Sequence, residues 1–175
     1  MEENSPEIPE YINEMIKSGK NPDEIRIDQE GNWLVNGITF DKTNITDRKI
    51  IKFFNKSIDK TKDGIYIIHY NNFIYPIVVE DTPFFITGVL FEGTEHNEKV
   101  YLSISNEKEE ELDVDTLHFK KNNCLYCYVM NKKYPARFKR SPAFHILDRL
   151  DESDDTYFLN ICGKRIVLTE KVEND

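Results

Sequence analysis

The sequence predicts a strand-rich α+β fold of two lobes, with a duplicated β-hairpin unit and two or three short helices. Hydrophobic residues make up 39% and aromatic residues 12% of the 175 positions, which is enough apolar bulk to form a core without a metal or disulfide. Short runs of β-branched and aromatic residues are separated by turn residues, as in β-rich domains. The dipeptide at Tyr75-Pro76 recurs at Tyr134-Pro135, each time after a strand pattern and a polar turn.

Composition and charge exclude several classes of function. The 23 basic and 32 acidic side chains give a formal charge of -9, which repels phosphate backbones and anionic lipids, so we expect no nucleic-acid partner and no membrane partner. The beginning of the chain, residues 1–16, is acidic where a signal peptide would be basic and then apolar. The odd number of cysteines, 3, argues for reduced thiols. We therefore expect a cytoplasmic protein.

The apolar spacing near the start of the chain predicts a helix, and the segment after it predicts a β-meander. Residues 1–20 form an acidic leader and a short helix over 10–17, with Tyr11, Ile12, Met15 and Ile16 on one face. Short apolar runs at 25–28, 33–35 and 38–40 are separated by turns. The dipeptide Asn36-Gly37 favours a tight hairpin, because both residues tolerate positive φ.

A second helix is predicted up to Ile58, capped by either Thr46 or Asn44, with Asp47 in its first turn. Strands are then expected at 65–70, 73–79, 84–90 and 100–104, the first two in a central position because both of their faces are apolar. The acidic stretch 107–115 is expected to form a solvated loop or a sheet edge.

The second half of the chain repeats part of the first. Tyr75-Pro76, Pro83 and Phe85 each recur 59 residues later, which predicts a duplicated hairpin inside one fold. The copies diverge after the second proline, where Ser141-Pro142 has the pattern of a capped helix start. We expect lobes at 21–115 and 116–175, the second ending in strands at 157–161 and 165–168.

Several motifs resemble one bacterial family, the domain of unknown function 1285 (DUF1285). These are the hairpin at 31–38, Phe53-Phe54 in the helix and, most specifically, the block Val79-Glu80-Asp81-Thr82-Pro83-Phe84. The resemblance extends over residues 25–169. It implies a two-lobed α+β fold with internal repeats, no established activity, and a part in signalling or ligand binding. Asp41 stands where the family pattern has a basic residue, and Asn71-Asn72 replaces its Pro-x-Glu.

The candidate ligand-binding residues are charged side chains at the ends of corresponding strands: Glu80, Asp81, Arg137, Lys139 and Arg140. The positions of Glu80 and Asp81 correspond to Lys139 and Arg140 in the second copy, so the charge is reversed between the copies. We predict a polar cleft where the two lobes meet. The bland alternative is that one carboxylate caps the bend before the proline while the other faces water.

No cofactor and no metal is expected. Cys124 and Cys127 have the spacing of a zinc or redox pair, which Cys162 with His145 or His118 could complete, but residues i and i+3 of a strand point to opposite faces. Free cysteines are therefore favoured. Among the other candidates, His69 and His145 are expected to pack as ordinary side chains, and Trp33 to anchor the core.

The sequence contains no nucleophile elbow, phosphate-binding glycine loop or zinc-protease motif, so we assign no catalytic residue. It favours a non-catalytic module that binds a small ligand or a protein partner, with a role in signal transduction. Two alternatives stay open: a small hydrolase or isomerase that uses Glu80 or Asp81, and a structural domain that forms homo-oligomers.

Overall fold

The computed structural model describes residues 23–94, 97–153 and 156–167, together with Glu10 and Glu14, which are helical. The rest of the helix predicted over 10–17 lies outside the described residues. The chain divides into two compact units, residues 1–83 and 84–175, and each is described by itself. The lobe boundary predicted at 115–116 differs from this division, because it falls inside the second unit.

The N-terminal unit begins with the predicted meander, β1 (Ile25–Ile27), β2 (Trp33–Val35) and β3 (Ile38–Thr39), which pair antiparallel in sequence order. Asn36 and Gly37 form the tight turn between β2 and β3 with φ values of 52° and 79°, as the dipeptide predicts. A fourth strand, β7 (Val78–Val79), adds to β1 in parallel. This long-range pairing is absent from the sequence prediction.

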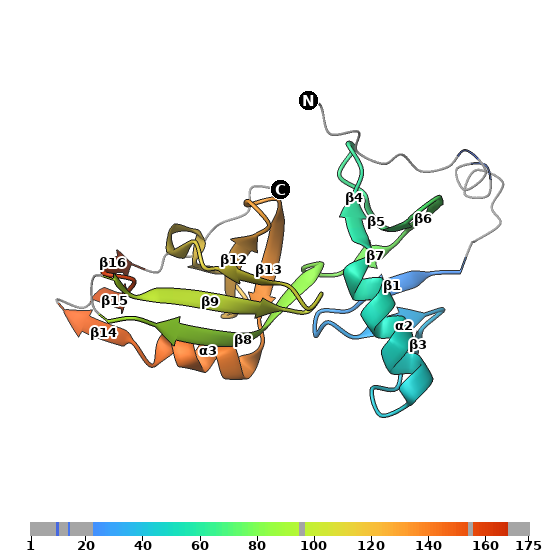
Figure 1. The fold of residues 1–175 in the computed structure, drawn as a ribbon. Helices are drawn as coiled ribbons and strands as arrows, with labels where there is room; N and C mark the ends of the chain where they lie inside the picture. Colours follow the sequence, from blue (N-terminus) through green and yellow to red (C-terminus); the bar gives the residue numbers. More distant parts are fainter. Residues whose placement is uncertain (1–9, 11–13, 15–22, 95–96, 154–155, 168–175) are drawn as a thin grey trace. The chain divides into compact units, whose positions relative to one another are not determined.

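Helix α2 (Ile45–Lys56) lies beside this sheet (Figure 1), and aromatic rings connect the two. Asn44 is its N-cap and accepts hydrogen bonds from the backbone amides of Thr46 and Asp47, so the first of the two predicted caps is not used and the second is confirmed. Trp33, 1% exposed, lies 5.0 Å from the ring of Phe54. The prediction that Trp33 anchors the core is confirmed.

A second sheet in this unit consists of β4 (Ile58–Lys60), β5 (Tyr66–Tyr70) and β6 (Phe73–Pro76), in that order. The sequence predicts Ile58 as the last residue of the helix, but the helix ends at Lys56 with Ser57 as its C-cap, and Ile58 starts a strand. Strand β5 is central, as predicted, whereas β6 is an edge strand.

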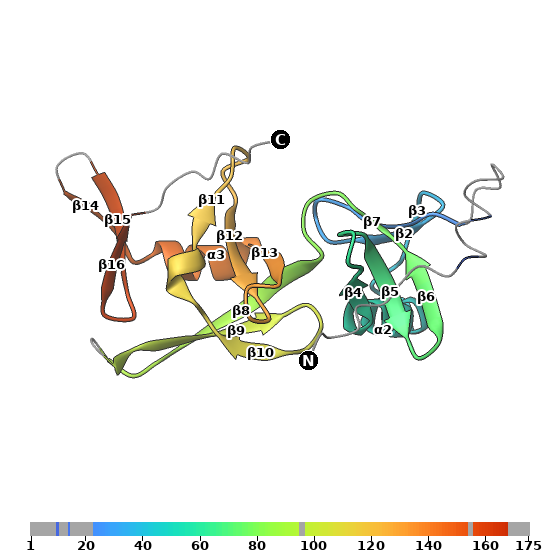
Figure 2. The same ribbon diagram turned by 90° about the horizontal axis from the view of Figure 1, so that it is seen from above.

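The C-terminal unit is built on a six-stranded sheet (Figure 2). Its strand order is β10-β9-β8-β13-β12-β11. The bounds of these strands are β8 (Phe84–Glu92), β9 (Lys99–Ile104), β10 (Glu109–Glu111), β11 (His118–Phe119), β12 (Leu125–Val129) and β13 (Tyr134–Phe138). The acidic stretch was expected to form a solvated loop or a sheet edge, and it forms the edge strand β10. The 3-10 turn Val114–Thr116 follows.

Helix α3 (Arg140–Leu147) packs against β8. The predicted cap at Ser141 is wrong, because the N-cap is Lys139, two residues earlier, and it makes no side-chain cap hydrogen bond. A three-stranded sheet closes the unit, with β14 (Leu150–Ser153), β15 (Thr156–Ile161) and β16 (Lys164–Val167) in sequence order.

The two hairpins of the predicted duplication, β5–β6 and β12–β13, are both antiparallel, and each places its Tyr-Pro dipeptide in the second strand. Their loops differ. Asn71 and Asn72 join the first pair, with Tyr70 opposite Phe73, whereas residues 130–133 join the second, with Val129 opposite Tyr134. The duplication itself stays a prediction.

The segments diverge after these hairpins, as predicted, because Phe85 lies in strand β8 and Phe144 in helix α3. No helix among the described residues has the length and apolar character needed to cross a membrane. The α+β class predicted from the sequence is confirmed.

Candidate functional site

The five residues predicted to bind a ligand fall into two groups. Glu80 and Asp81 directly follow β7 in the N-terminal unit, whereas Arg137, Lys139 and Arg140 lie at the end of β13 and the start of α3 in the C-terminal unit. Each group is described within its own unit, and the pairing predicted between them stays a prediction.

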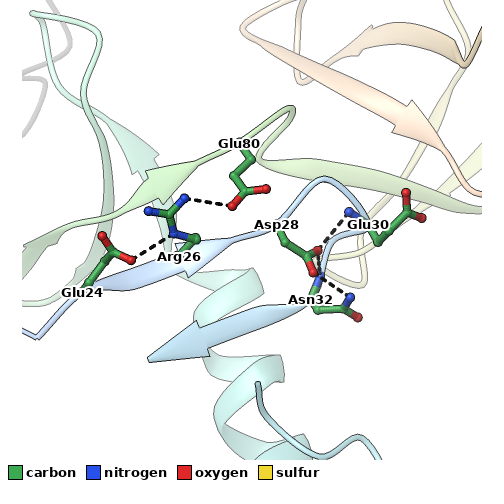
Figure 3. Close-up of polar contacts among 6 residues, drawn as sticks. All are labelled: Glu24, Arg26, Asp28, Glu30, Asn32 and Glu80. Atoms are coloured by element: carbon green, nitrogen blue, oxygen red, sulfur yellow. Dashed lines mark hydrogen bonds and ion pairs between the residues drawn. The ribbon is translucent and has the colours of Figure 1, made fainter. Parts of the chain in front are cut away.

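Glu80 is held by an arginine that the sequence analysis did not single out. The carboxylate of Glu80 accepts a hydrogen bond from the guanidinium of Arg26 at 2.8 Å, and Glu24 accepts another at 3.0 Å (Figure 3). The backbone amide of Glu80 also donates to the carbonyl of Ile27 at 3.0 Å. Glu80 therefore extends the pairing of β7 with β1.

The charges of this group are mutually stabilising. Hydrogen bonds to the carboxylates of Glu24 and Glu80 raise the pKa of Arg26 above its ordinary value, and the hydrogen bond from Arg26 lowers the pKa of Glu24. One cation is thus shared between two carboxylates that are partly exposed to solvent. Such an arrangement fixes neighbouring strands, and it leaves the local charge negative.

A third carboxylate in Figure 3, that of Asp28, stabilises a turn. Asp28 accepts hydrogen bonds from the backbone amides of Glu30 and Asn32 and from the side chain of Asn32. Partial burial acts to raise the pKa of Asp28, but these hydrogen bonds outweigh it, and the pKa lies below its ordinary value. The side chain thereby stabilises the connection between β1 and β2.

The basic residues of the predicted site lie against aromatic rings. The ammonium of Lys139 is 4.3 Å from the ring centroid of Phe85, and the guanidinium of Arg140 is 5.5 Å from that of Phe144. Arg137 is half-buried and lies directly opposite Phe85 in the parallel pairing of β13 with β8. These contacts keep the long side chains extended along the protein surface.

A cleft of about 660 Å³ lies beside the Arg26 group, within the N-terminal unit. It is lined by the start of β1, the turn between β2 and β3, and the segment from β6 to β7, through the residues Asp23, Glu24, Ile25, Asn36, Tyr75, Pro76, Ile77 and Val78. Glu24 therefore belongs both to this cleft and to the ion-paired group of Figure 3.

Hydrogen bonds fix the walls of this cleft, which we call the acidic cleft. Asn36 accepts from the backbone amide of Glu24 and donates to the carboxylate of Asp23, both at 2.8 Å. The hydroxyl of Tyr75 donates to the backbone carbonyl of Asp23 at 2.7 Å. The tight turn and the edge strand β6 are therefore tied to the same short segment, which makes the cleft a preformed feature of the unit.

The acidic cleft combines negative charge with aromatic surface. Among the described residues, its lining includes two carboxylates, Asp23 and Glu24, and no basic side chain. The rings of Phe73 and Tyr75 stack with centroids 6.0 Å apart, and Phe73 is 45% exposed. A cationic group entering the cleft would meet carboxylates and the face of an aromatic ring, which are the two protein surfaces that attract cations.

The cysteines lie where free thiols are expected. Cys127 is fully buried in β12, and Cys124, directly before this strand, is half-buried. Burial raises the pKa of Cys127, and the charge of Glu110 adds to this effect. In the described parts of the chain, no three His, Cys, Asp or Glu side chains come together in a way that could hold a metal ion.

The histidines have separate surroundings. His69 lies 3.4 Å from a carboxylate oxygen of Asp59, and both are half-buried. The Nδ1 of His118 donates to the carbonyl of Thr116 at 2.8 Å, and its ring is buried. His145 was expected to pack as an ordinary side chain, but it is exposed because its position in α3 faces away from β8.

Sequence reasoning missed the residues that form the acidic cleft and the ion-paired group beside it. Arg26 has the pattern of an outward-facing residue between two isoleucines, and its partner Glu80 is 54 positions away. Asn36 was identified as a turn residue only, although its side chain also binds Asp23 and Glu24. The single local signal was the tyrosine of the Tyr-Pro dipeptide at 75–76, which was assigned to the repeat.

Comparison with known proteins identifies the fold. No family model matches the sequence, and no curated protein matches it. The structure is similar to that of a DUF1285 family protein from Silicibacter pomeroyi, with a TM-score of 0.65 and 15% identity over 83% of this chain and 79% of that one. It is also similar to a DUF1285 family protein from Shewanella baltica, with a TM-score of 0.53 and 17% identity over 72% of this chain and 91% of that one. The fold is that of DUF1285 proteins, and the resemblance predicted from the motifs is confirmed at this level.

Proposed function

We propose that the chain is a non-catalytic binding module whose acidic cleft receives a basic group of a small ligand or a protein partner. The observation that carries this proposal is the meeting of Asp23, Glu24 and the ring of Tyr75 around one cleft. Binding without turnover suits the role in signal transduction that the family resemblance implies. A cytoplasmic setting agrees with the free thiols.

The geometry favours binding over the hydrolase or isomerase alternative. A general base must be available to take a proton from a substrate, whereas Glu80 is engaged by the guanidinium of Arg26 at 2.8 Å. The carboxylate of Asp23 is likewise engaged, because it accepts a hydrogen bond from Asn36. This hydrogen bond fixes its position, which suits it to holding a bound group. These carboxylates act as fixed negative charges.

The size and charge of the cleft indicate the chemistry of its ligand. A volume of about 660 Å³ is in the range of clefts that hold a small molecule or a few side chains of a peptide. Lysine and arginine side chains, as well as free amines, supply a cation on an apolar stem. Such a stem would lie along Ile25 and Val78 while its charged end meets the carboxylates.

Isothermal titration calorimetry with a pentalysine peptide tests the proposal directly. We expect the parent protein to bind pentalysine and not pentaglutamate. The variant Asp23→Asn keeps the acceptor for Asn36 and removes one charge, and it should weaken binding about two- to fivefold, as for one exposed ion pair. The matched control is Asp63→Asn, an exposed aspartate in a turn of the same unit, which should bind as the parent does.

The outcomes separate the alternatives. Equal weakening by Asp63→Asn, or no binding of pentalysine, would contradict the cleft as a cation site. Mass spectrometry of the recovered peptide would show cleavage if the protein were a hydrolase. If the protein bound no peptide and light scattering showed that it forms homo-oligomers, the alternative of a structural oligomerisation domain would be favoured.

A further inference from the structure

A second cleft, of about 500 Å³, lies within the C-terminal unit and has the opposite charge. We call it the basic cleft. It is bounded by the three-stranded sheet β14–β16 and the segment before β9. Of the residues that the structure describes, three basic side chains line it, Arg149, Lys164 and Arg165, with Glu98 as the one acidic residue. Such a concentration of positive charge is unusual for a chain with a formal charge of -9.

The floor of the basic cleft is rigidly built around Glu98, whose side chain is only 9% exposed. One carboxylate oxygen of Glu98 pairs with the guanidinium of Arg149, and the other accepts a hydrogen bond from the backbone amide of Cys162 at 2.9 Å. The guanidinium of Arg149 also lies 3.9 Å from the ring centroid of Phe91. The negative charge of Glu98 is thus compensated by the guanidinium of Arg149, so it does not repel an anion in the cleft.

Arg165 supplies the positive charge that is left over. Its guanidinium lies 3.5 Å from the ring centroid of Phe158, and within the described residues it forms no hydrogen bond or ion pair. Asn160 lies directly opposite Arg165 in the pairing of β15 with β16, so the two side chains share one face of the sheet. A guanidinium that lies over a ring keeps its N–H donors available for other partners.

Lys164 lines the basic cleft, but its charge is already paired. Its ammonium pairs with the carboxylate of Asp115 at 2.7 Å, and both side chains are more than half exposed. Successive residues of a strand point to opposite faces, so Lys164, which lies opposite Ile161, is on the other face of β16 from Arg165. The turn before Lys164 is fixed, because Cys162 and Gly163 adopt φ values of 50° and 67°, and the amide of Cys162 is bound by Glu98.

We propose that the basic cleft binds a small organic anion through a carboxylate or phosphate group, with Arg165 as the principal contact and Asn160 beside it. Arginine recognises both groups by paired N–H donors. The cleft is larger than a single oxyanion requires, which leaves room for an organic body. This site is separate from the acidic cleft and does not depend on the function proposed there.

The alternative without a ligand is that these side chains form an ordinary solvated surface. Two observations argue against it. A solvated surface has no need of a nearly buried carboxylate that neutralises Arg149, and an isolated arginine on it would not be held against a ring that is 5% exposed, as Phe158 is. Both features reduce the conformational freedom that a ligand would otherwise have to restrict.

The test is calorimetry on the full chain with inorganic phosphate and with succinate, at low ionic strength. We expect saturable binding of at least one of them by the parent protein. Arg165→Gln keeps the stem and removes the charge and the paired donors, so it should weaken binding at least about fivefold. Arg165→Lys, which keeps the charge alone, should fall between the two.

The matched control is Arg48→Gln, which removes the same charge from an exposed position on α2. It should bind the anion as the parent does, and Arg165→Gln should leave pentalysine binding unchanged. Binding of phosphate alone, of succinate alone or of both supports the site and distinguishes its preferred group. Absence of saturable binding, or an equal loss in Arg48→Gln and Arg165→Gln, would overturn the proposal.

Discussion

The hydrogen bond between Trp33 and Asn55 makes a quantitative test of how helix α2 is attached to the meander. The indole N–H of Trp33 donates to the side-chain oxygen of Asn55 at 2.8 Å, and the tryptophan is 1% exposed. Asn55→Ala removes the acceptor and leaves a buried donor without its partner, which costs about 1–3 kcal/mol. Alanine is the better helix former by up to about 0.7 kcal/mol, so the net loss should be about 0.5–2.5 kcal/mol.

The assay uses the fluorescence of Trp33, which is the only tryptophan in the chain and therefore reports unfolding of the N-terminal unit. For a unit of this size, a loss of 1 kcal/mol lowers Tm by about 4–8 °C. Asn55→Asp retains an acceptor oxygen, and it should lose much less stability than Asn55→Ala. Lys49→Ala, at an exposed position of the same helix, controls for helix propensity.

A double-mutant cycle isolates the hydrogen bond from other effects. In a Trp33→Phe background the donor is absent, so Asn55→Ala should cost at least about 1 kcal/mol less than it does in the parent, as measured by circular dichroism in urea. An equal cost of Asn55→Ala in the two backgrounds would show that the contact does not stabilise the unit.

Three further predictions concern stability and reactivity. Asn44→Ala removes the N-cap of α2 and should destabilise the N-terminal unit by about 0.5–2 kcal/mol in urea titrations; a midpoint equal to that of Lys49→Ala would contradict it. Because the pKa of Asp28 is lowered in the folded state, its contribution is present at neutral pH and is lost as the pH falls below about 4. The deficit of Asp28→Asn relative to the parent, measured by urea titration, should therefore shrink in acid, and an unchanged deficit would contradict this. Cys127, whose pKa is raised by burial, should react with iodoacetamide only after unfolding, and rapid labelling in the native protein, detected by peptide mass spectrometry, would refute its burial.

Local rules predicted most of the individual elements of this fold. The turn at Asn36, the cap at Asn44 and the hairpin that follows Phe84 depend on neighbouring residues, and each is present in the structure. The errors also have local causes. Ile58 continues the apolar spacing of the helix, yet Ser57 is the C-cap, with a φ of -104° and a ψ of 5°. An apolar residue directly after a helix fits both the helical period and the start of a strand.

Long-range pairing limited the prediction of the site. Glu80 was identified as a candidate, but its role depends on the parallel pairing of β7 with β1, which brings it to Arg26 across 54 positions. No periodicity within either segment contains that information. The basic cleft was missed for the same reason, because Glu98 and Arg149 come from segments 51 positions apart. Isolated charges in a sequence therefore carry little information until the strand order is known.

Residues of the block 79–84, which carries the resemblance to DUF1285 proteins most specifically, have structural roles that can be followed one by one. Val79 pairs with β1, and Glu80 binds Arg26. Thr82 and Phe84 are buried, at 0% and 1% exposure, and the boundary between the two units falls between residues 83 and 84. A block with these constraints determines how a strand ends and a new unit begins, which explains why it indicates a fold and no chemistry. The surfaces that differ in charge, the acidic cleft and the basic cleft, lie outside the block, and ligand recognition should therefore follow the residues that line them.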